Sequence, residues 1–332
     1  MKKILLATTV LVGTAGFAAA EVTLSGDARM GIAKADTAGD ANFTSRARVS
    51  FGLSGESDSG LSFGASFRAD NASSAESGTA GSAYISGAFG KLSMGDVDGA
   101  AAAAVGQVDG VGLTGLGDGN ELTYIAGGGF DNDDLLDADI DVSFTNDPSA
   151  LYEFSTGAVT VYASVTNPGY EADGDDDTSV TLPVDGIAYA IGAVYSTDTY
   201  KAAIGYENLT VTIDGDDYSA TQTVIGGDAT FGAVTVKARY GVASGDDEAA
   251  DRGVTQYALS ATYAADSMSA TIYTRNVSAD DASILDVQTM GLGASYDLGG
   301  GAKVVGGVAR ISDNNRDDNS GTVYDLGVSF SF

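Results

Sequence analysis

Four arginines lie near one another in the sequence, although bases are scarce in it. Lysine and arginine together number 16 among 332 residues, against 46 acids. Arg29, Arg46, Arg48 and Arg68 fall in the first quarter of the chain. Guanidinium groups attract anions and repel one another, so a fold that gathered these four would also need acids opposite them.

Acids are concentrated in the segment that follows. From Leu92 to Tyr200 the sequence has no lysine or arginine, and twelve acids lie between Asp96 and Asp147. We expect the segment from Asp96 to Asp147 to be a loop that joins two strands, and a loop of this length in a compact protein usually has a function. The acids that we expect to face the arginines are Asp96, Asp98, Asp109, Asp118 and Glu121.

Dense carboxylates also suggest calcium, because Ca²⁺ prefers hard oxygen ligands and a carboxylate cluster is costly without a counter-ion. No EF-hand fits, since Thr178 occupies the glycine position that should follow Asp173, Asp175 and Asp177. The site that we favour comprises Asp118, Asn120 and Glu121, with a solvated acidic surface loop as an equal alternative.

Composition excludes several classes of function. The sequence has no His and no Cys, so a Ser-His-Asp triad, a thiol nucleophile, a disulfide framework and the common zinc sites are all excluded. No Ser-x-x-Lys or paired-carboxylate signature stands out. The formal charge of −30 argues against binding to nucleic acid. We therefore expect no enzyme and no organic cofactor.

The first twenty residues have the pattern of a cleaved signal peptide. Lys2 and Lys3 form a basic head, an apolar stretch follows, and Ala18 to Ala20 supply the small residues before the cleavage site. We expect residues 1–20 to be removed and residues 21–332 to form one domain, with a loop at about residues 96–149.

Alternation of apolar and polar residues with a period of two then dominates the chain. In residues 22–33, Val22, Leu24, Met30 and Ile32 share one face, and comparable faces recur to the C-terminus. Counting weaker segments, the pattern predicts about sixteen strands. The best helix candidate is the alanine-rich stretch at residues 99–105.

Two architectures fit many amphipathic strands: a soluble sandwich or solenoid, and a membrane barrel. The apolar faces are rich in Ala and Tyr, and we expect the tyrosines at strand ends to form an aromatic girdle at headgroup depth; these are Tyr195, Tyr200, Tyr206, Tyr240, Tyr257 and Tyr263. Tight turns alternate with longer acidic loops, which favours a transmembrane antiparallel β-barrel. Phe332 ends an alternating run of aromatic and apolar residues, and this pattern resembles the C-terminal signal recognised by the barrel assembly machinery.

Several segments resemble one family, the general diffusion porins of purple alphaproteobacteria (Rhodobacter-type). They are Glu21-Val22-Thr23-Leu24-Ser25-Gly26-Asp27-Ala28-Arg29-Met30-Gly31, Ser45 to Val49, Asp58 to Phe67, Ser86 to Asp96 and Gly291 to Gly301. The resemblance is dense over residues 21–96 and the last fifty or so. It implies a sixteen-stranded trimeric barrel with a long third loop folded into the pore, calcium near that loop, and diffusion of small hydrophilic solutes.

The strand faces lead to the same expectation. If the apolar faces meet lipid, the four arginines point inward on adjacent strands and the acidic loop faces them across the lumen. We expect weak cation selectivity for ions and small hydrophilic solutes in the Gram-negative outer membrane. The expected partners are two further copies of the chain, outer-membrane lipid and lipopolysaccharide. The alternative is a secreted or surface calcium-binding β-rich adhesin.

Overall fold

The computed structural model of the chain describes residues 21–72, 76–78, 81–125, 143–145, 149–166, 169–171, 184–213, 216–246, 252–280, 285–314 and 320–332. The predicted signal peptide and the acids between residues 126 and 142 lie outside these ranges. Among the residues that are described, no helix is long and apolar enough to cross a membrane.

Most of the described residues lie in strands. They are β1 (Glu21–Lys34), β2 (Asn42–Glu56), β3 (Ser62–Ala72), β4 (Glu76–Gly78), β5 (Ser82–Gly87), β6 (Gly90–Gly95), β7 (Ser143–Thr145), β8 (Ser149–Thr156), β9 (Val159–Thr166), β10 (Gly169–Glu171), β11 (Val184–Ser196), β12 (Tyr200–Ile213), β13 (Asp216–Phe231), β14 (Val234–Asp246), β15 (Arg252–Ala265), β16 (Met268–Ala279), β17 (Asp286–Gly299), β18 (Ala302–Asp313) and β19 (Gly321–Ser331). One short helix, α1, spans Ala100–Val105, where the alanine-rich stretch predicted it.

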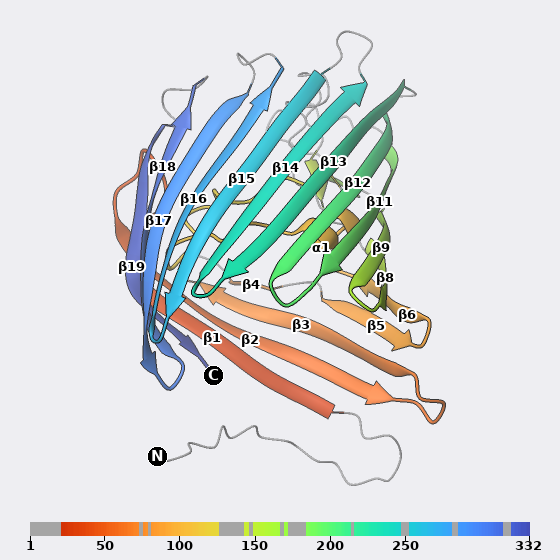
Figure 1. The fold of residues 1–332 in the computed structure, drawn as a ribbon, viewed down its shortest axis with the longest axis horizontal. Coiled ribbons are helices and arrows are strands. Elements are labelled where there is room, and N and C mark those ends of the chain that lie inside the picture. The colour runs from red at the N-terminus through yellow and green to blue at the C-terminus, as the bar shows by residue number, and fades with distance from the viewer. Residues whose placement is uncertain are drawn as a thin grey trace.

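The strands close into a barrel (Figure 1). Each wall strand pairs antiparallel with its neighbours, and β1 joins the two ends of the chain by pairing with both β2 and β19. Both β4 and β5 pair with β3 and together take the place of one strand, so the wall is sixteen strands wide. The short strands β7 and β10 form a separate pair. The predicted fold class is confirmed.

Alternation along each strand separates two environments. On β12, Tyr200, Ala202 and Ile204 are exposed on the outer face, whereas Ala203 and Glu207 are buried on the inner face. The exposed apolar side chains of the molecule lie on such outer faces. Because lipid, not water, meets an apolar band of this kind in an outer-membrane barrel, this exposure stabilises the protein in a bilayer.

The prediction that the girdle tyrosines sit at strand ends is correct for some and wrong for others. Tyr195, Tyr200 and Tyr263 lie near strand ends, and Tyr200 contacts Phe231 edge to face at 6.4 Å between ring centroids. Tyr206, Tyr240 and Tyr257, however, lie near the middle of β12, β14 and β15. The strands run further than the ten residues expected. After Tyr206, for example, the outer face of β12 continues with Asn208 and Thr210.

The wall is uneven in height. β5 and β6 have six residues each and β8 and β9 eight, whereas β11 to β19 have 11 to 16. A tilted strand needs about 9–11 residues to cross the hydrocarbon layer. The low side of the barrel is therefore too short to span that layer on its own.

The segment after β6 turns into the barrel and packs against its inner wall. α1 lies against β9, β11, β12 and β13 (Figure 1), and its Ala100, Ala101, Ala104 and Val105 are fully buried. Glycines on the wall allow this close approach, because a Cβ at Gly192 would come 2.5 Å from the Ala100 carbonyl oxygen and one at Gly205 would meet Ala101 at 2.6 Å. The larger of the two buried apolar clusters in the described chain thus lies inside the barrel, between loop and wall.

Candidate functional site in the barrel lumen

The four predicted arginines come together on three adjacent strands. Arg29 on β1 stands directly opposite Arg46 on β2, and Arg48 and Arg68 follow on β2 and β3. Their neighbours Met30, Val49 and Phe67 are exposed on the outer face, so the arginines project to the inside. These positions agree with the strand faces read from the sequence.

Acids on the same strands pair with these arginines. Arg46 donates to Asp27 at 3.3 Å, Arg48 to Asp70 at 2.8 Å, and Arg68 to both oxygens of Asp70 at 2.6 and 3.0 Å. The repulsion among the arginines is thus relieved largely within the wall itself. Neither Asp27 nor Asp70 was among the predicted site residues, although both share the inward face of their strands.

Basic side chains of the opposite wall hold the end of α1. Arg239 on β14, which is buried, donates to the carbonyl oxygens of Gly106 at 3.0 Å and Gln107 at 3.2 Å, and its guanidinium also pairs with Asp228 at 2.6 Å. Lys201 on β12 donates to the Val105 carbonyl at 3.3 Å. Cations at the C-terminal end of a helix complement its free carbonyl groups.

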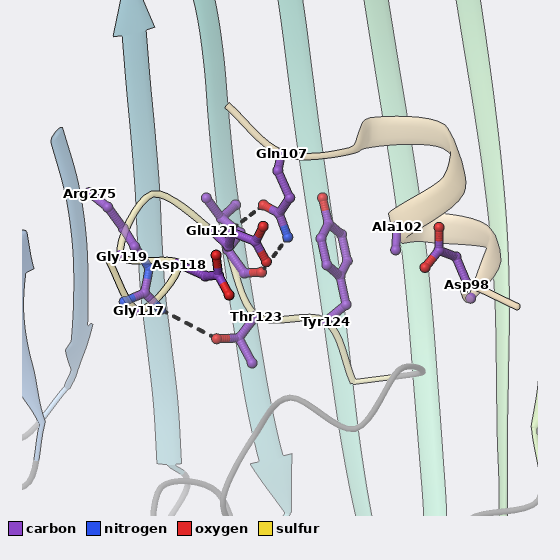
Figure 2. A pocket seen from close by; sticks show the side chains of 12 residues that line it. Asp98, Ala102, Gln107, Gly117, Asp118, Gly119, Glu121, Thr123, Tyr124 and Arg275 are labelled. Carbon is purple, nitrogen blue, oxygen red and sulfur yellow. Dashed lines mark hydrogen bonds between the residues drawn. The ribbon is translucent and has the colours of Figure 1, made fainter. Parts of the chain in front are cut away.

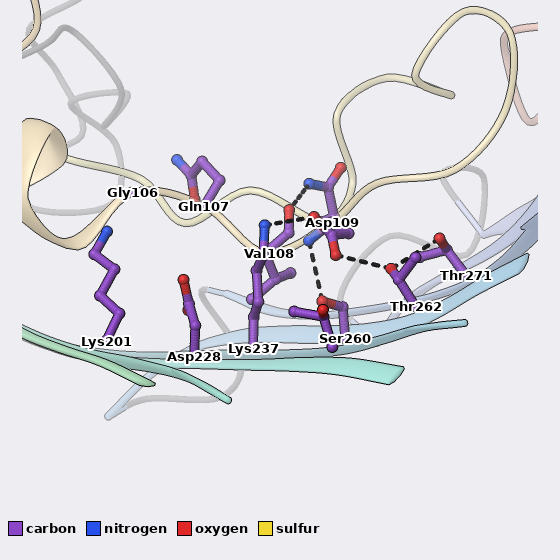
Figure 3. A network of polar contacts seen from close by, with 12 residues as sticks. Gly106, Gln107, Val108, Asp109, Lys201, Asp228, Lys237, Ser260, Thr262 and Thr271 are labelled. Carbon is purple, nitrogen blue, oxygen red and sulfur yellow. Dashed lines mark hydrogen bonds and ion pairs between the residues drawn. The ribbon is translucent and has the colours of Figure 1, made fainter. Parts of the chain in front are cut away.

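Asp109 also belongs to this wall and not to the arginine cluster (Figure 3). Its carboxylate accepts from Lys237 Nζ at 2.6 Å and from the Thr262 hydroxyl at 2.8 Å, and its backbone amide donates to Ser260 Oγ at 3.1 Å. The expectation that Asp109 faces the arginines is therefore wrong. A lysine that projects inward from β14 is its partner instead.

The segment after Glu121 runs along a row of buried amide and carboxyl side chains. Glu207, Gln222 and Gln256, from β12, β13 and β15, are at most 1% exposed. Glu207 accepts from the Ile125 amide at 2.9 Å, and Gln222 and Gln256 donate to the Thr123 carbonyl at 2.9 and 2.7 Å. These contacts replace the hydrogen bonds to water that the loop backbone gives up.

The middle of the loop reaches the strands beside the seam of the barrel. Asp325 on β19 accepts from the amide and the hydroxyl of Thr114 at 2.7 and 2.8 Å, and Arg29 donates to the Leu113 carbonyl at 3.1 Å. Arg29 thus binds the loop backbone, whereas Arg46, Arg48 and Arg68 bind acids of the wall. Asp96 is the predicted loop acid close enough to Arg68 to interact with it electrostatically.

The remaining predicted acids line a cavity of about 430 Å³ between α1 and β16 (Figure 2). Asp98, Asp118 and Glu121 border it together with Arg275, which was not among the predicted site residues. Burial raises the pKa of Glu121, and the nearby charge of Asp118 raises it further, while Arg275 acts in the opposite direction. Burial likewise raises the pKa of Tyr124, on the same cavity, above its usual range.

Only part of the predicted calcium ligand set is placed to bind a metal ion. Asn120 is buried, and its amide nitrogen donates to the Val108 carbonyl at 2.7 Å, so it packs the loop where a ligand was expected. Nowhere in the described ranges do three acidic side chains come close enough to form a metal site. Asp118 and Glu121 are the two members of the predicted ligand set whose side chains border the cavity.

The inward partners of the loop were missed in the sequence although their pattern was visible. They are Lys201, Glu207, Gln222, Lys237, Arg239, Gln256, Arg275 and Asp325. Each is a charged or amide residue whose neighbours along the strand belong to the apolar outer face. Because side chains alternate between the two faces of a strand, this pattern already indicated that these residues point inward.

Comparisons with known proteins agree with this architecture. The family model for Gram-negative porins matches residues 7–318. A porin of Rhodobacter capsulatus is 37% identical over 334 residues, which covers 94% of this chain and all of that protein. A solved porin structure refined at 1.8 Å resolution is 34% identical, with a TM-score of 0.70 and the same coverage. A variant of the Rh. blastica porin, 24% identical with a TM-score of 0.61 over 94% of this chain and all of that one, shares the fold.

Proposed function

This chain belongs to the Gram-negative porin family, and we propose that it is a general diffusion porin whose water-filled lumen is narrowed between the loop and the arginines of β1 to β3. A porin of this family is an outer-membrane channel and not an enzyme. The adhesin alternative is not favoured.

The anchoring of the loop is the observation that carries this proposal. Hydrogen bonds tie residues 100–125 to β1, β9, β12 to β16 and β19, through partners that include the buried Glu207 and Gln256. Arg46, Arg48 and Arg68, which pair with the wall acids Asp27 and Asp70, lie on β2 and β3. The solute path that we propose runs between these arginines and the loop.

Passage through such a constriction needs no energy input. Arginines on one side and loop acids on the other create a field across the path, in which polar solutes can orient their dipoles and apolar ones meet ordered water. The acids outnumber the bases, which favours cations, and the arginines limit that preference. We expect weak cation selectivity.

Reconstitution in planar bilayers tests the proposal. Wild-type protein should give stepwise conductance, and its reversal potential in a KCl gradient should show a small preference for potassium. Arg48→Gln should increase that preference, because one positive charge leaves the path while Asp70 keeps its contacts with Arg68.

Arg310→Gln is the matched control, since Arg310 is exposed on the outer face of β18 and its replacement alters the total charge equally. It should leave the reversal potential unchanged. A preference for chloride in the wild type, or equal shifts in the two variants, would contradict the proposed path.

We also propose that the carboxylates of Asp118 and Glu121 bind calcium. This is supported by their closeness, since the charge of Asp118 disfavours ionisation of Glu121 and a cation between them would relieve this cost. Titration calorimetry of the wild type should give saturable heat that Asp118→Asn removes. Heat that does not saturate would count against a site.

We also propose a homotrimer, inserted by the assembly machinery among lipids and lipopolysaccharide. The low wall around β5 and β6 supports it, because Ile85 and Met94 are exposed on these two strands and Phe89 in the turn between them, and both strands are too short to span the hydrocarbon layer. Neighbouring copies would cover this side of each barrel.

A further inference from the structure

The cavity between α1 and β16 contains charged groups of both signs that are not paired with one another. Arg275 enters it from β16, and Asp118 and Glu121 enter it from the loop (Figure 2). The usual arrangement for opposite charges at close quarters is an ion pair, as between Lys237 and Asp109 nearby. Here the groups interact electrostatically without coming into contact.

The guanidinium group of Arg275 has hydrogen-bond donors that are not used within the described part of the chain. Its hydrogen bond to the Thr123 hydroxyl is long, at 3.4 Å, and its buried Nε has no partner within the part of the chain that the structure describes. In the same ranges it forms no ion pair within 4.0 Å. A guanidinium with free donors is the preferred protein group for a carboxylate, which it binds with two parallel hydrogen bonds.

The two acids are unpaired in a similar way. Asp118 lies in a turn with φ of 53°, where its carbonyl accepts from the Glu121 amide at 2.9 Å, so the backbone holds the two side chains on one side of the cavity. Neither carboxylate takes part in an ion pair among the residues described. Two adjacent carboxylates attract a cation that can donate several hydrogen bonds, and an ammonium group offers three.

We propose that this cavity is a weak binding subsite for zwitterionic α-amino acids, with the solute carboxylate on Arg275 and its ammonium group on Asp118 and Glu121. The inference rests on the proposed pore, because the solute reaches the cavity from the lumen. A solute with only one charge meets repulsion from the group of the same sign, and a neutral solute satisfies neither. The cavity is large enough for the solute to keep water around it.

Weak binding of this kind would favour passage. Solutes cross a pore fastest when a site attracts them into the narrow region and still releases them readily. The subsite would therefore raise the flux of dilute amino acids relative to neutral solutes of equal size. It would do so without closing the path to ions.

Single-channel recording in dilute KCl with a chelator present tests the subsite, since the chelator keeps divalent cations off the acids. The probe is L-serine, and its partial analogues are ethanolamine, which lacks the carboxylate, 3-hydroxypropionate, which lacks the amine, and glycerol, which lacks both charges. Serine should lower the KCl conductance saturably, and each analogue should need a concentration about tenfold higher or more, because each loses at least one charge-assisted contact.

Two variants locate the effect. Arg275→Gln and Glu121→Gln should each weaken the serine effect about tenfold or more while KCl conductance persists, whereas Arg310→Gln should leave it unchanged. Retention of the serine effect in both lumen variants would overturn the subsite, as would an equal effect of ethanolamine or 3-hydroxypropionate. KCl conductance without any serine effect overturns the subsite alone. Absence of KCl conductance in the wild type overturns the proposed pore as well.

Discussion

Asp109 joins the loop to the wall through both of its carboxylate oxygens and its backbone amide. Its partner Lys237 is 128 residues away in the sequence, so the contact fixes the loop across a long connection. The pair is partly exposed to water, and we expect it to contribute about 0.5–1 kcal/mol to the seating of the loop.

Asp109→Asn should therefore loosen the loop while nearly preserving the shape of the side chain. Single-channel traces should show more frequent current fluctuations, and a protease should cut the loop faster. Asp217→Asn, an equal change on the exposed outer part of β13, should affect neither measurement. Quiet traces from Asp109→Asn would show that Lys237 is not needed to hold the loop.

Glu121 gives the loop a dependence on pH. Burial and the charge of Asp118 raise its pKa, so as the pH falls from neutrality Glu121 takes up its proton before an ordinary exposed carboxyl does. Because the pKa is higher in the folded loop than in an unfolded chain, protonation favours the folded loop, and this contribution is lost as the pH rises through the raised pKa.

The cation preference of the pore should decrease as the pH falls through this range, since one negative charge leaves the lumen. Glu121→Gln should remove that step from a titration of the reversal potential between about pH 4 and pH 8. Asp98→Asn, which changes the charge of the same cavity equally, should retain it. A step that survives in Glu121→Gln belongs to another group.

At the scale of elements, β5 and β6 are the part of the barrel most in need of a neighbour. Asn in place of Ile85, which is 39% exposed on β5, should reduce the trimer fraction, because it puts a polar group into the proposed subunit contact. The same change at Ile272, which is exposed on the full-length strand β16, should meet lipid and spare the trimer.

Light scattering of the detergent-solubilised proteins, together with unheated gel electrophoresis, would compare the two variants. Equal loss of trimer in Ile85→Asn and Ile272→Asn would place the subunit contact elsewhere on the barrel.

Elements also differ in how far the sequence predicts them. Strand alternation is local, so β1 to β3 and the inward direction of Arg46, Arg48 and Arg68 could be predicted from neighbouring residues. The position of the loop depends on pairs such as Asp109 with Lys237 and Thr114 with Asp325, which are 128 and 211 residues apart. The number of acids in the loop segment was enough to predict that acids lie in the lumen. Which base each acid contacts depends on how the barrel closes.

For the whole molecule, closure of the barrel depends on the two ends of the chain. The Phe332 amide donates to the Gly26 carbonyl at 2.9 Å, and the Phe332 side chain is 77% exposed. An aromatic ring this exposed contributes little to packing, and we therefore expect its role to lie in recognition during assembly.

Phe332→Ala should therefore reduce the amount of trimer in the outer membrane of producing cells several-fold. Its melting temperature after refolding in detergent should hardly change. Phe231→Ala, which removes a ring that is 59% exposed at the end of β13, should leave the yield in cells near that of the wild type. A melting temperature lowered in parallel with the yield would indicate a packing role for Phe332.

Two lysines of the lumen contact the loop, whereas three of its arginines pair with acids of the wall. Lys201 and Lys237 lie under the loop, while Arg46, Arg48 and Arg68 lie on the wall beyond it. Reagents that acylate amines do not modify guanidinium groups, so a small water-soluble acylating agent can report on the loop without altering the arginines. The rate at which Lys237 is acylated should then rise when the loop leaves the wall, and mass spectrometry of native protein can follow that rate without mutation.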